Sequence, residues 1–156
     1  MTWAEVAERL SAARTYWLGT TTVSGAPHAA PVWGAVTGGT LYLYSERSTV
    51  KARNLAIDPR IVIHLESGED VLIVHGVAED LGLPASIPSV VAALSAKYTR
   101  PEDRPYLPDA DPAFDVVYAL RPHSALAWRL DDYQASQRRW SFGDAPSVAG
   151  APGLER

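Results

Sequence analysis

The chain of 156 residues contains no cysteine, which excludes disulfide bonds, thiolate metal sites and a cysteine nucleophile. Positive charge is also scarce, because 14 Lys and Arg residues face 18 Asp and Glu residues and the formal net charge is −4. A general nucleic-acid-binding protein needs a broad basic field to displace counterions from phosphates. The charge balance therefore argues against that class.

Long apolar runs are absent as well. None reaches the roughly 20 residues that a membrane-spanning helix needs. The first ten residues, MTWAEVAERL, carry charges where a signal peptide has its apolar core. We therefore expect no membrane span and a cytoplasmic location. The sequence also lacks glycine-rich phosphate loops of Walker or Rossmann type and the G-x-S-x-G elbow of serine hydrolases.

Apolar residues make up 47% of the chain, and their spacing mostly predicts strands. Thr2 and Glu5 form a capping box before an apolar stripe at helical spacing, which predicts a first helix. Runs rich in β-branched and aromatic residues, separated by turn signals, predict strands. The expected strands cover residues 16–22, 27–36, 40–45, 60–66, 71–79, 114–122 and 124–130, and the further expected helices cover 48–57 and 87–98.

Seven closely spaced strands with few crossover helices favour an antiparallel barrel or sandwich over a doubly wound sheet. We find no internal repeat and no second domain, so a single domain is expected over residues 1–142. Residues 143–156 are small, polar and rich in Gly and Pro, and we expect them to form a flexible tail.

The stretch RSTVKARNLAIDPR, residues 47–60, concentrates basic residues within an acidic chain. Ser48 is the expected N-cap of its helix. Lys51 then falls in the first turn, where the helix dipole disfavours a cation. An anion bound at the helix start would offset that cost. A solvated basic helix face is the other interpretation, and the pattern alone leaves both open.

Histidines and aromatic residues give two weaker indications. A simple hairpin over residues 67–70 would place His64 and His75 on one sheet face, as half of a metal site. No third ligand stands at a convincing spacing, so ordinary strand histidines are favoured over a metal site. Trp33 lies between a proline-containing segment and a glycine, in PVWG, where the backbone is open for a flat ligand to approach.

The order of these motifs resembles a known family. The order is S-G-x-P-H-x-x-P-V-W over residues 24–33, an L-Y-L-Y strand, R-S-x-x-K-A-R-N-L, D-P-R, and a G-x-A-E strand that ends at Glu79. It is similar to the split β-barrel superfamily of pyridoxamine 5′-phosphate oxidase-like flavoproteins, and within it to the actinobacterial flavin/deazaflavin oxidoreductases. The resemblance covers residues 16–79 well and continues more loosely to residues 137–142.

The resemblance implies a mainly β protein, an antiparallel split β-barrel of the FMN-binding type. It also implies a homodimer with cofactor sites at the subunit interface. A phosphate would be bound by the residues matching R-S-x-x-K-x-R-N, and a ring system would lie along those matching P-V-W. These residues are Arg47, Ser48, Lys51, Arg53 and Asn54 for the phosphate, and Pro31, Val32 and Trp33 for the ring. The motifs favour the deazaflavin coenzyme F420, with FMN as the alternative.

The implied function is hydride transfer from reduced F420 or FMN to a small, planar, electron-poor substrate, with His28, Tyr44 or solvent as proton donor. The alternatives are a non-catalytic flavin or deazaflavin carrier and, less favoured, an apolar-ligand barrel without cofactor. The arginine–proline–arginine segment of vitamin B6 oxidases is replaced by Arg138-Arg139-Trp140. This difference argues against oxidation of pyridoxamine phosphate.

Overall fold

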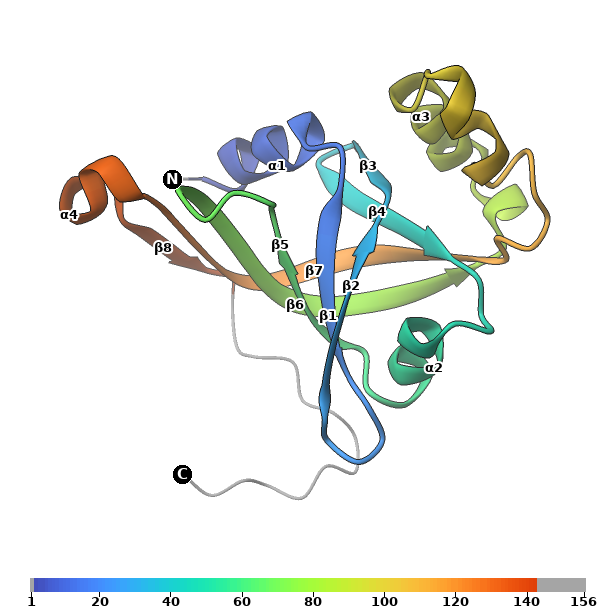
Figure 1. Cartoon of the computed structure of the whole chain (residues 1–156), viewed down its shortest axis with the longest axis horizontal. Coiled ribbons are helices and arrows are strands. Elements are labelled where there is room, and N and C mark those ends of the chain that lie inside the picture. Colours follow the sequence, from blue (N-terminus) through green and yellow to red (C-terminus); the bar gives the residue numbers. More distant parts are fainter. Residues whose placement is uncertain (1, 143–156) are drawn as a thin grey trace.

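Eight antiparallel strands form one strongly curved sheet in the computed structural model, which describes residues 2–142 (Figure 1). The strand order is β2-β1-β5-β6-β7-β4-β3, and β8 pairs with β7. This architecture confirms the expected split β-barrel. The strands are β1 (Tyr16–Thr21), β2 (Pro27–Val32), β3 (Gly34–Thr37), β4 (Thr40–Ser45), β5 (Arg60–His64), β6 (Asp70–Gly82), β7 (Val116–Arg129) and β8 (Arg138–Ser141).

Short helices surround the sheet. The α-helices are α1 (Trp3–Ala12), α2 (Val50–Ile57), α3 (Pro88–Lys97) and α4 (Tyr133–Ser136), and the 3₁₀ helices are η1 (Pro84–Ser86), η2 (Pro101–Tyr106) and η3 (Leu130–Asp132). The capping box of α1 is confirmed, because the Thr2 side chain accepts from the Glu5 N–H and the Glu5 carboxylate accepts from the Thr2 N–H. Helix α1 buries Val6 and Leu10 completely against the sheet.

Two strand predictions were wrong. The single strand expected over residues 27–36 is divided at Trp33, where β2 ends its pairing with β1 and β3 begins its pairing with β4. The two strands expected over 114–130 are one strand, β7. The sheet accommodates Pro122 and His123 through a register shift opposite Gly76, so the proline does not end the strand. Strand β8 was not predicted as a strand.

The N-cap of α2 was also assigned wrongly. Thr49 is the cap, and its hydroxyl accepts a hydrogen bond from the Ala52 N–H at 3.3 Å. Ser48 is exposed and lies one residue before the cap. Both residue types are good caps, so local preference alone could not separate them. The position of Lys51 in the first turn is confirmed.

The core consists of two clusters of buried side chains. The larger one fills the curved sheet beneath α1, and includes Leu10, Leu41, Ile63 and Val74. The smaller one lies between α3 and strands β3 and β4, and includes Tyr44, Leu94 and Tyr98. The second cluster fixes the segment between β6 and β7 onto the main sheet.

Gly76 provides a test of the register shift between β6 and β7. A Cβ atom there would lie 2.3 Å from the Arg121 carbonyl oxygen and 2.9 Å from the Pro122 Cα. Relief of these contacts would require the backbone of β7 to move. We predict that Gly76→Ala lowers the free energy of unfolding by about 1–3 kcal/mol in chemical denaturation. Gly68→Ala, in the open β5–β6 loop, is the matched control and should change it by less than about 0.5 kcal/mol. Equal stability of the two variants would contradict the account of this bulge.

Candidate functional site

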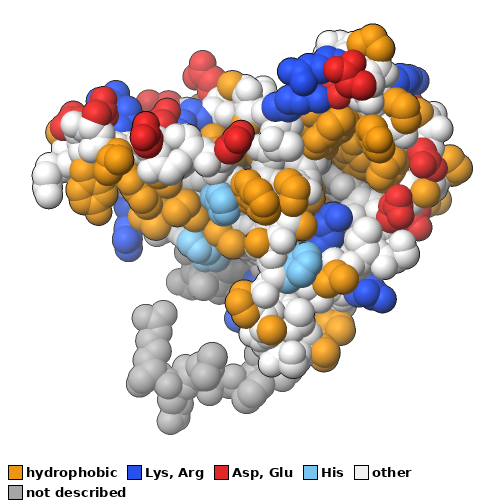
Figure 2. Space-filling view, viewed as in Figure 1, with side chains coloured by type: hydrophobic (Ala, Val, Ile, Leu, Met, Phe, Trp, Pro, Cys, Tyr) orange, Lys and Arg blue, Asp and Glu red, His pale blue; other side chains and the backbone are white. Residues whose placement is uncertain are grey.

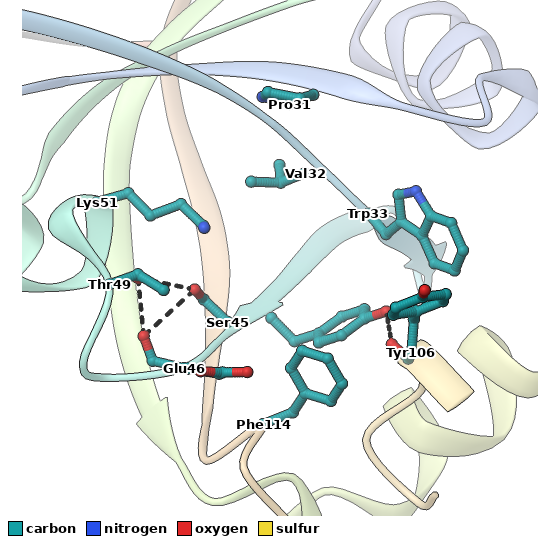
Figure 3. Close-up of a pocket in the computed structure, with 10 residues that line it drawn as sticks. Pro31, Val32, Trp33, Ser45, Glu46, Thr49, Lys51, Tyr106 and Phe114 are labelled. Atoms are coloured by element: carbon teal, nitrogen blue, oxygen red, sulfur yellow. Dashed lines mark hydrogen bonds between the residues drawn. The ribbon is translucent and has the colours of Figure 1, made fainter. Parts of the chain in front are cut away.

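A groove of about 450 Å³ opens where the end of β2, the end of β4 and the start of α2 meet (Figure 3). One end is polar and the rest is mainly aromatic. Its lining residues are Pro31, Val32, Trp33, Tyr44, Ser45, Glu46, Thr49, Lys51, Tyr106 and Phe114. Four residues that the sequence singled out for a cofactor therefore lie together here: Pro31, Val32, Trp33 and Lys51.

Lys51 supplies the positive charge of the groove. Its side chain is half-buried and extends into the hollow (Figure 3). Within residues 2–142 its ammonium group has no hydrogen bond or ion pair. Burial lowers the pKa of Lys51, and the nearby Glu46 carboxylate opposes this effect only in part. A half-buried cation without a partner favours an anionic ligand.

The first turn of α2 is held by a small polar network. The Thr49 hydroxyl donates to the Glu46 carbonyl oxygen at 2.8 Å and lies 3.1 Å from the Ser45 hydroxyl (Figure 3). On the buried side of the helix, Asn54 Nδ2 donates to Thr20 Oγ1 at 3.1 Å. These contacts fasten α2 to β4 and β1, and so fix the direction in which Lys51 points.

Trp33 forms one aromatic wall. Its ring stacks on Tyr98 with a centroid separation of 4.3 Å and an interplanar angle of 8°. The guanidinium carbon of Arg14 lies 5.1 Å from the Trp33 ring centroid and 5.3 Å from that of Tyr98, which suits cation–π attraction. Arg14 in turn pairs with the buried Asp103 at 2.5 Å, and this hydrogen bond lowers the pKa of Asp103. The indole is therefore held in a defined orientation.

Tyr44, Tyr106 and Phe114 supply the rest of the aromatic lining, and the Tyr106 ring meets the Trp33 ring edge to face at 6.3 Å. The rings of Tyr44 and Phe114 meet edge to face at 5.2 Å. The Tyr44 hydroxyl donates to the Tyr106 carbonyl oxygen at 2.6 Å. Burial raises the pKa of Tyr44 well above its ordinary value, so the group stays neutral near pH 7. With its proton engaged, Tyr44 acts here as a structural wall.

The other predicted phosphate residues lie away from the groove lining. Arg47 pairs with Asp80 through two hydrogen bonds of 2.7 and 3.0 Å. Ser48 and Arg53 are exposed, and Asn54 is buried against Thr20. The structure therefore brings Lys51 into the hollow and gives Arg47 and Asn54 protein partners.

Six lining residues were not predicted as cofactor contacts: Tyr44, Ser45, Glu46, Thr49, Tyr106 and Phe114. Ser45 and Glu46 follow directly after the L-Y-L-Y strand, and their adjacency to the basic helix was the available signal. Tyr106 and Phe114 belong to the long segment between β6 and β7, which folds back over the site. No local sequence pattern predicts that this segment folds back over the site. Its position depends on contacts between residues more than 60 apart in sequence, such as Tyr44 and Tyr106.

A larger hollow of about 860 Å³ lies on the outer face of β1, β5 and β6. Its lining includes His28, His75 and His123. The register places His64 and His75 on one sheet face, as predicted, opposite Ile73 and Val62. Among the described residues, however, no group of three or more His, Cys, Asp or Glu side chains could hold a metal ion. No helix in this part of the chain is long and apolar enough to cross a membrane.

A family model described as pyridoxamine 5′-phosphate oxidase matches residues 2–128. The chain belongs to this family. The match covers the sheet and the aromatic groove through β7, so the arrangement described above is the family's fold in this chain. No match is found among the curated proteins.

Solved structures share the fold of this pyridoxamine 5′-phosphate oxidase family member. The conserved hypothetical protein Rv2991 from Mycobacterium tuberculosis is 26% identical, with a TM-score of 0.69 over 97% of this chain and 94% of the other. An F420 reductase is 24% identical, with a TM-score of 0.60 over 76% and 94%. A heme binding protein from Mycobacterium smegmatis is 23% identical, with a TM-score of 0.68 over 90% and 58%. The last two similarities establish the fold alone.

Proposed function

We propose that the groove binds a flavin-type cofactor, F420 in preference to FMN, and that the protein is an oxidoreductase acting on a small, planar, electron-poor substrate. One observation carries this proposal. A single groove joins a half-buried lysine, which has no partner among the described residues, to a hollow walled by aromatic rings. A ring system with a phosphate-bearing chain is the ligand class that matches both ends.

At the polar end, Lys51 and the start of α2 would hold the phosphate. Helix N-termini present N–H groups and partial positive charge, and a lysine adds a charge-assisted hydrogen bond. Arg47 and Asn54 have a different role in this proposal, because they tie the helix to Asp80 and Thr20. Of the residues that the sequence predicted to bind phosphate, only Lys51 would contact it through a side chain. Arg47 and Asn54 would hold the helix in place.

At the other end, Trp33, Tyr106 and Phe114 would flank the ring and exclude water. The volume of about 450 Å³ lies within the usual range of small-molecule sites, about 300–1,000 Å³. When bound, F420 or FMN supplies the hydride, and the protein positions the cofactor and shields it. The F420 preference rests on PHAAPVW together with KARN, and a related fold is an F420 reductase.

A second copy of the chain would complete the site. Cross-strand pairing places Trp17, Val62, Ile73 and Leu126 on the outer face of β1, β5, β6 and β7. This outer apolar face adjoins the 860 Å³ hollow, and hydrophobic and histidine side chains gather across the strands in Figure 2. Covering such a face is a strong reason for a chain to pair with itself.

Substitution on the outer apolar face tests the homodimer. Trp17 is 38% exposed in the single chain, so we expect Trp17→Glu to fold. We expect this variant to sediment as a monomer and to lose affinity for the cofactor, because a charge on the covered face opposes association. Val23→Glu, at an 80% exposed valine in the β1–β2 turn, is the control and should remain a dimer. A wild-type protein that sediments as a monomer at micromolar concentration would refute the dimer.

Lys51→Ala tests the phosphate end. Loss of a charge-assisted hydrogen bond should weaken cofactor binding by about 1.5–3 kcal/mol, as measured by titration. Added salt should weaken binding of the cofactor to the wild-type protein, because part of the attraction is screened. Arg53→Ala, which removes an exposed cation from the same helix, should bind nearly as the wild type does. Equal affinities of Lys51→Ala and wild type would remove Lys51 from the site.

Steady-state assays separate the reductase from a carrier. We expect the protein loaded with reduced F420, or with reduced FMN, to reduce at least one member of a panel of quinones, enones and tetrapyrroles. Oxidation of the cofactor is followed by absorbance, and Lys51→Ala should raise the cofactor concentration needed for half-maximal rate. Tight cofactor binding without turnover of any acceptor would show a carrier instead.

A further inference from the structure

Glu46 places a carboxylate in the same groove as Lys51. Its backbone is fixed, since the Glu46 carbonyl oxygen accepts from the Thr49 hydroxyl at 2.8 Å and from the Thr49 N–H at 3.1 Å. Its side chain is half-buried and lines the groove (Figure 3). Within the described residues the carboxylate has no hydrogen bond or ion pair. Among the described residues, the Glu46 carboxylate is therefore available to accept a hydrogen bond from a ligand.

The charges that line the groove consequently balance. Lys51 is the one cation and Glu46 the one anion among the lining residues described. The guanidinium of Arg47 is committed to Asp80, and Arg53 is exposed outside the lining. Glu46 and Lys51 are close enough to interact electrostatically. The charged side chains of the lining thus sum to zero, although they offer a ligand a cation and an acceptor.

The charge balance in the groove affects which type of phosphate ester it binds best. A phosphate monoester carries close to two negative charges at neutral pH, because its second pKa is about 6. A phosphodiester carries one. In a partly desolvated site, a dianion beside Lys51 leaves one negative charge uncompensated and close to the Glu46 carboxylate. A singly charged phosphodiester beside Lys51 leaves no uncompensated negative charge. A hydroxyl group of the ligand can then donate a hydrogen bond to the Glu46 carboxylate.

We propose that Glu46 is a specificity-determining residue that favours ligands with a singly charged phosphodiester and nearby hydroxyl groups over ligands with a dianionic phosphomonoester. This inference rests on the proposed function, because it requires that the groove hold a phosphate-bearing ring ligand. It also gives a physical basis for choosing between the two cofactors: F420 carries a phosphodiester and FMN carries a monoester.

Two of three probes isolate the effect of the phosphate charge. FMN and riboflavin share the ring and the hydroxyl-bearing chain and differ by the phosphate, so the ratio of their dissociation constants reports the phosphate alone. F420 supplies the diester. We expect Glu46→Gln to increase the preference for FMN over riboflavin roughly 3- to 10-fold at pH 8, where FMN is dianionic. The affinity for F420 should change less than the affinity for FMN.

Glu66→Gln is the matched control, because it removes the same charge at an exposed position outside the groove. It should leave all three dissociation constants unchanged. An unaltered FMN-to-riboflavin ratio in Glu46→Gln, with FMN still bound, would overturn the role of Glu46 and leave the proposed function intact. Failure of all three probes to bind the wild-type protein would overturn the proposed function, and this inference with it.

Discussion

At Trp33 and Gly34 the chain leaves the ladder of β1 and joins the ladder of β4, and the groove depends on this change of partner. A Cβ atom on Gly34 would lie 2.5 Å from the Tyr42 carbonyl oxygen, so only glycine fits. The Tyr98 hydroxyl accepts from the Gly34 N–H at 3.0 Å, and Lys97 Nζ donates to the Gly34 carbonyl oxygen at 2.7 Å. Both backbone groups of Gly34 are therefore satisfied by the last residue of α3 and by its C-cap, Tyr98.

The same contacts orient the aromatic wall. Tyr98, which holds Gly34, is also the ring on which Trp33 stacks, and its hydroxyl donates to the Arg14 carbonyl oxygen at 2.6 Å. Burial raises the pKa of Tyr98 to about 12 and lowers the pKa of Lys97 to about 8. The side chains of Lys97 and Tyr98 are therefore partly shielded from water where they hold the junction between β2 and β3. The segment between β6 and β7 carries Lys97, Tyr98, Tyr106 and Phe114, so it both holds Trp33 and supplies part of the aromatic lining.

Local sequence patterns predicted the structural features that depend on residues close together in the chain. The capping box at Thr2, most strand positions and the first-turn location of Lys51 follow from spacing alone. The break at Trp33 was missed because it is imposed by Tyr98, 64 residues away from Gly34 in sequence. The continuity of β7 through Pro122 was missed because a bulge opposite Gly76 compensates for the proline. Family resemblance supplied the fold, but could not show which basic residues face the hollow.

The basic stretch over residues 47–60 contains ordinary charged surface and one candidate ligand contact. Arg47 and Arg60 are paired with Asp80 and Asp58, and Arg53 is exposed, so much of the stretch is an ordinary charged surface. Lys51 differs because it is half-buried, without a partner among the described residues, and next to an aromatic hollow. A single cation therefore makes the start of this helix a candidate ligand site.

The central claim is that the groove binds a phosphate-bearing flavin or deazaflavin. The most direct measurement is a titration of the purified full-length chain with F420 and with FMN, followed by the fluorescence of the coenzyme. The account predicts saturable binding of at least one coenzyme, with F420 bound more tightly than FMN. A preparation that leaves the fluorescence of both coenzymes unchanged at high micromolar protein would contradict it.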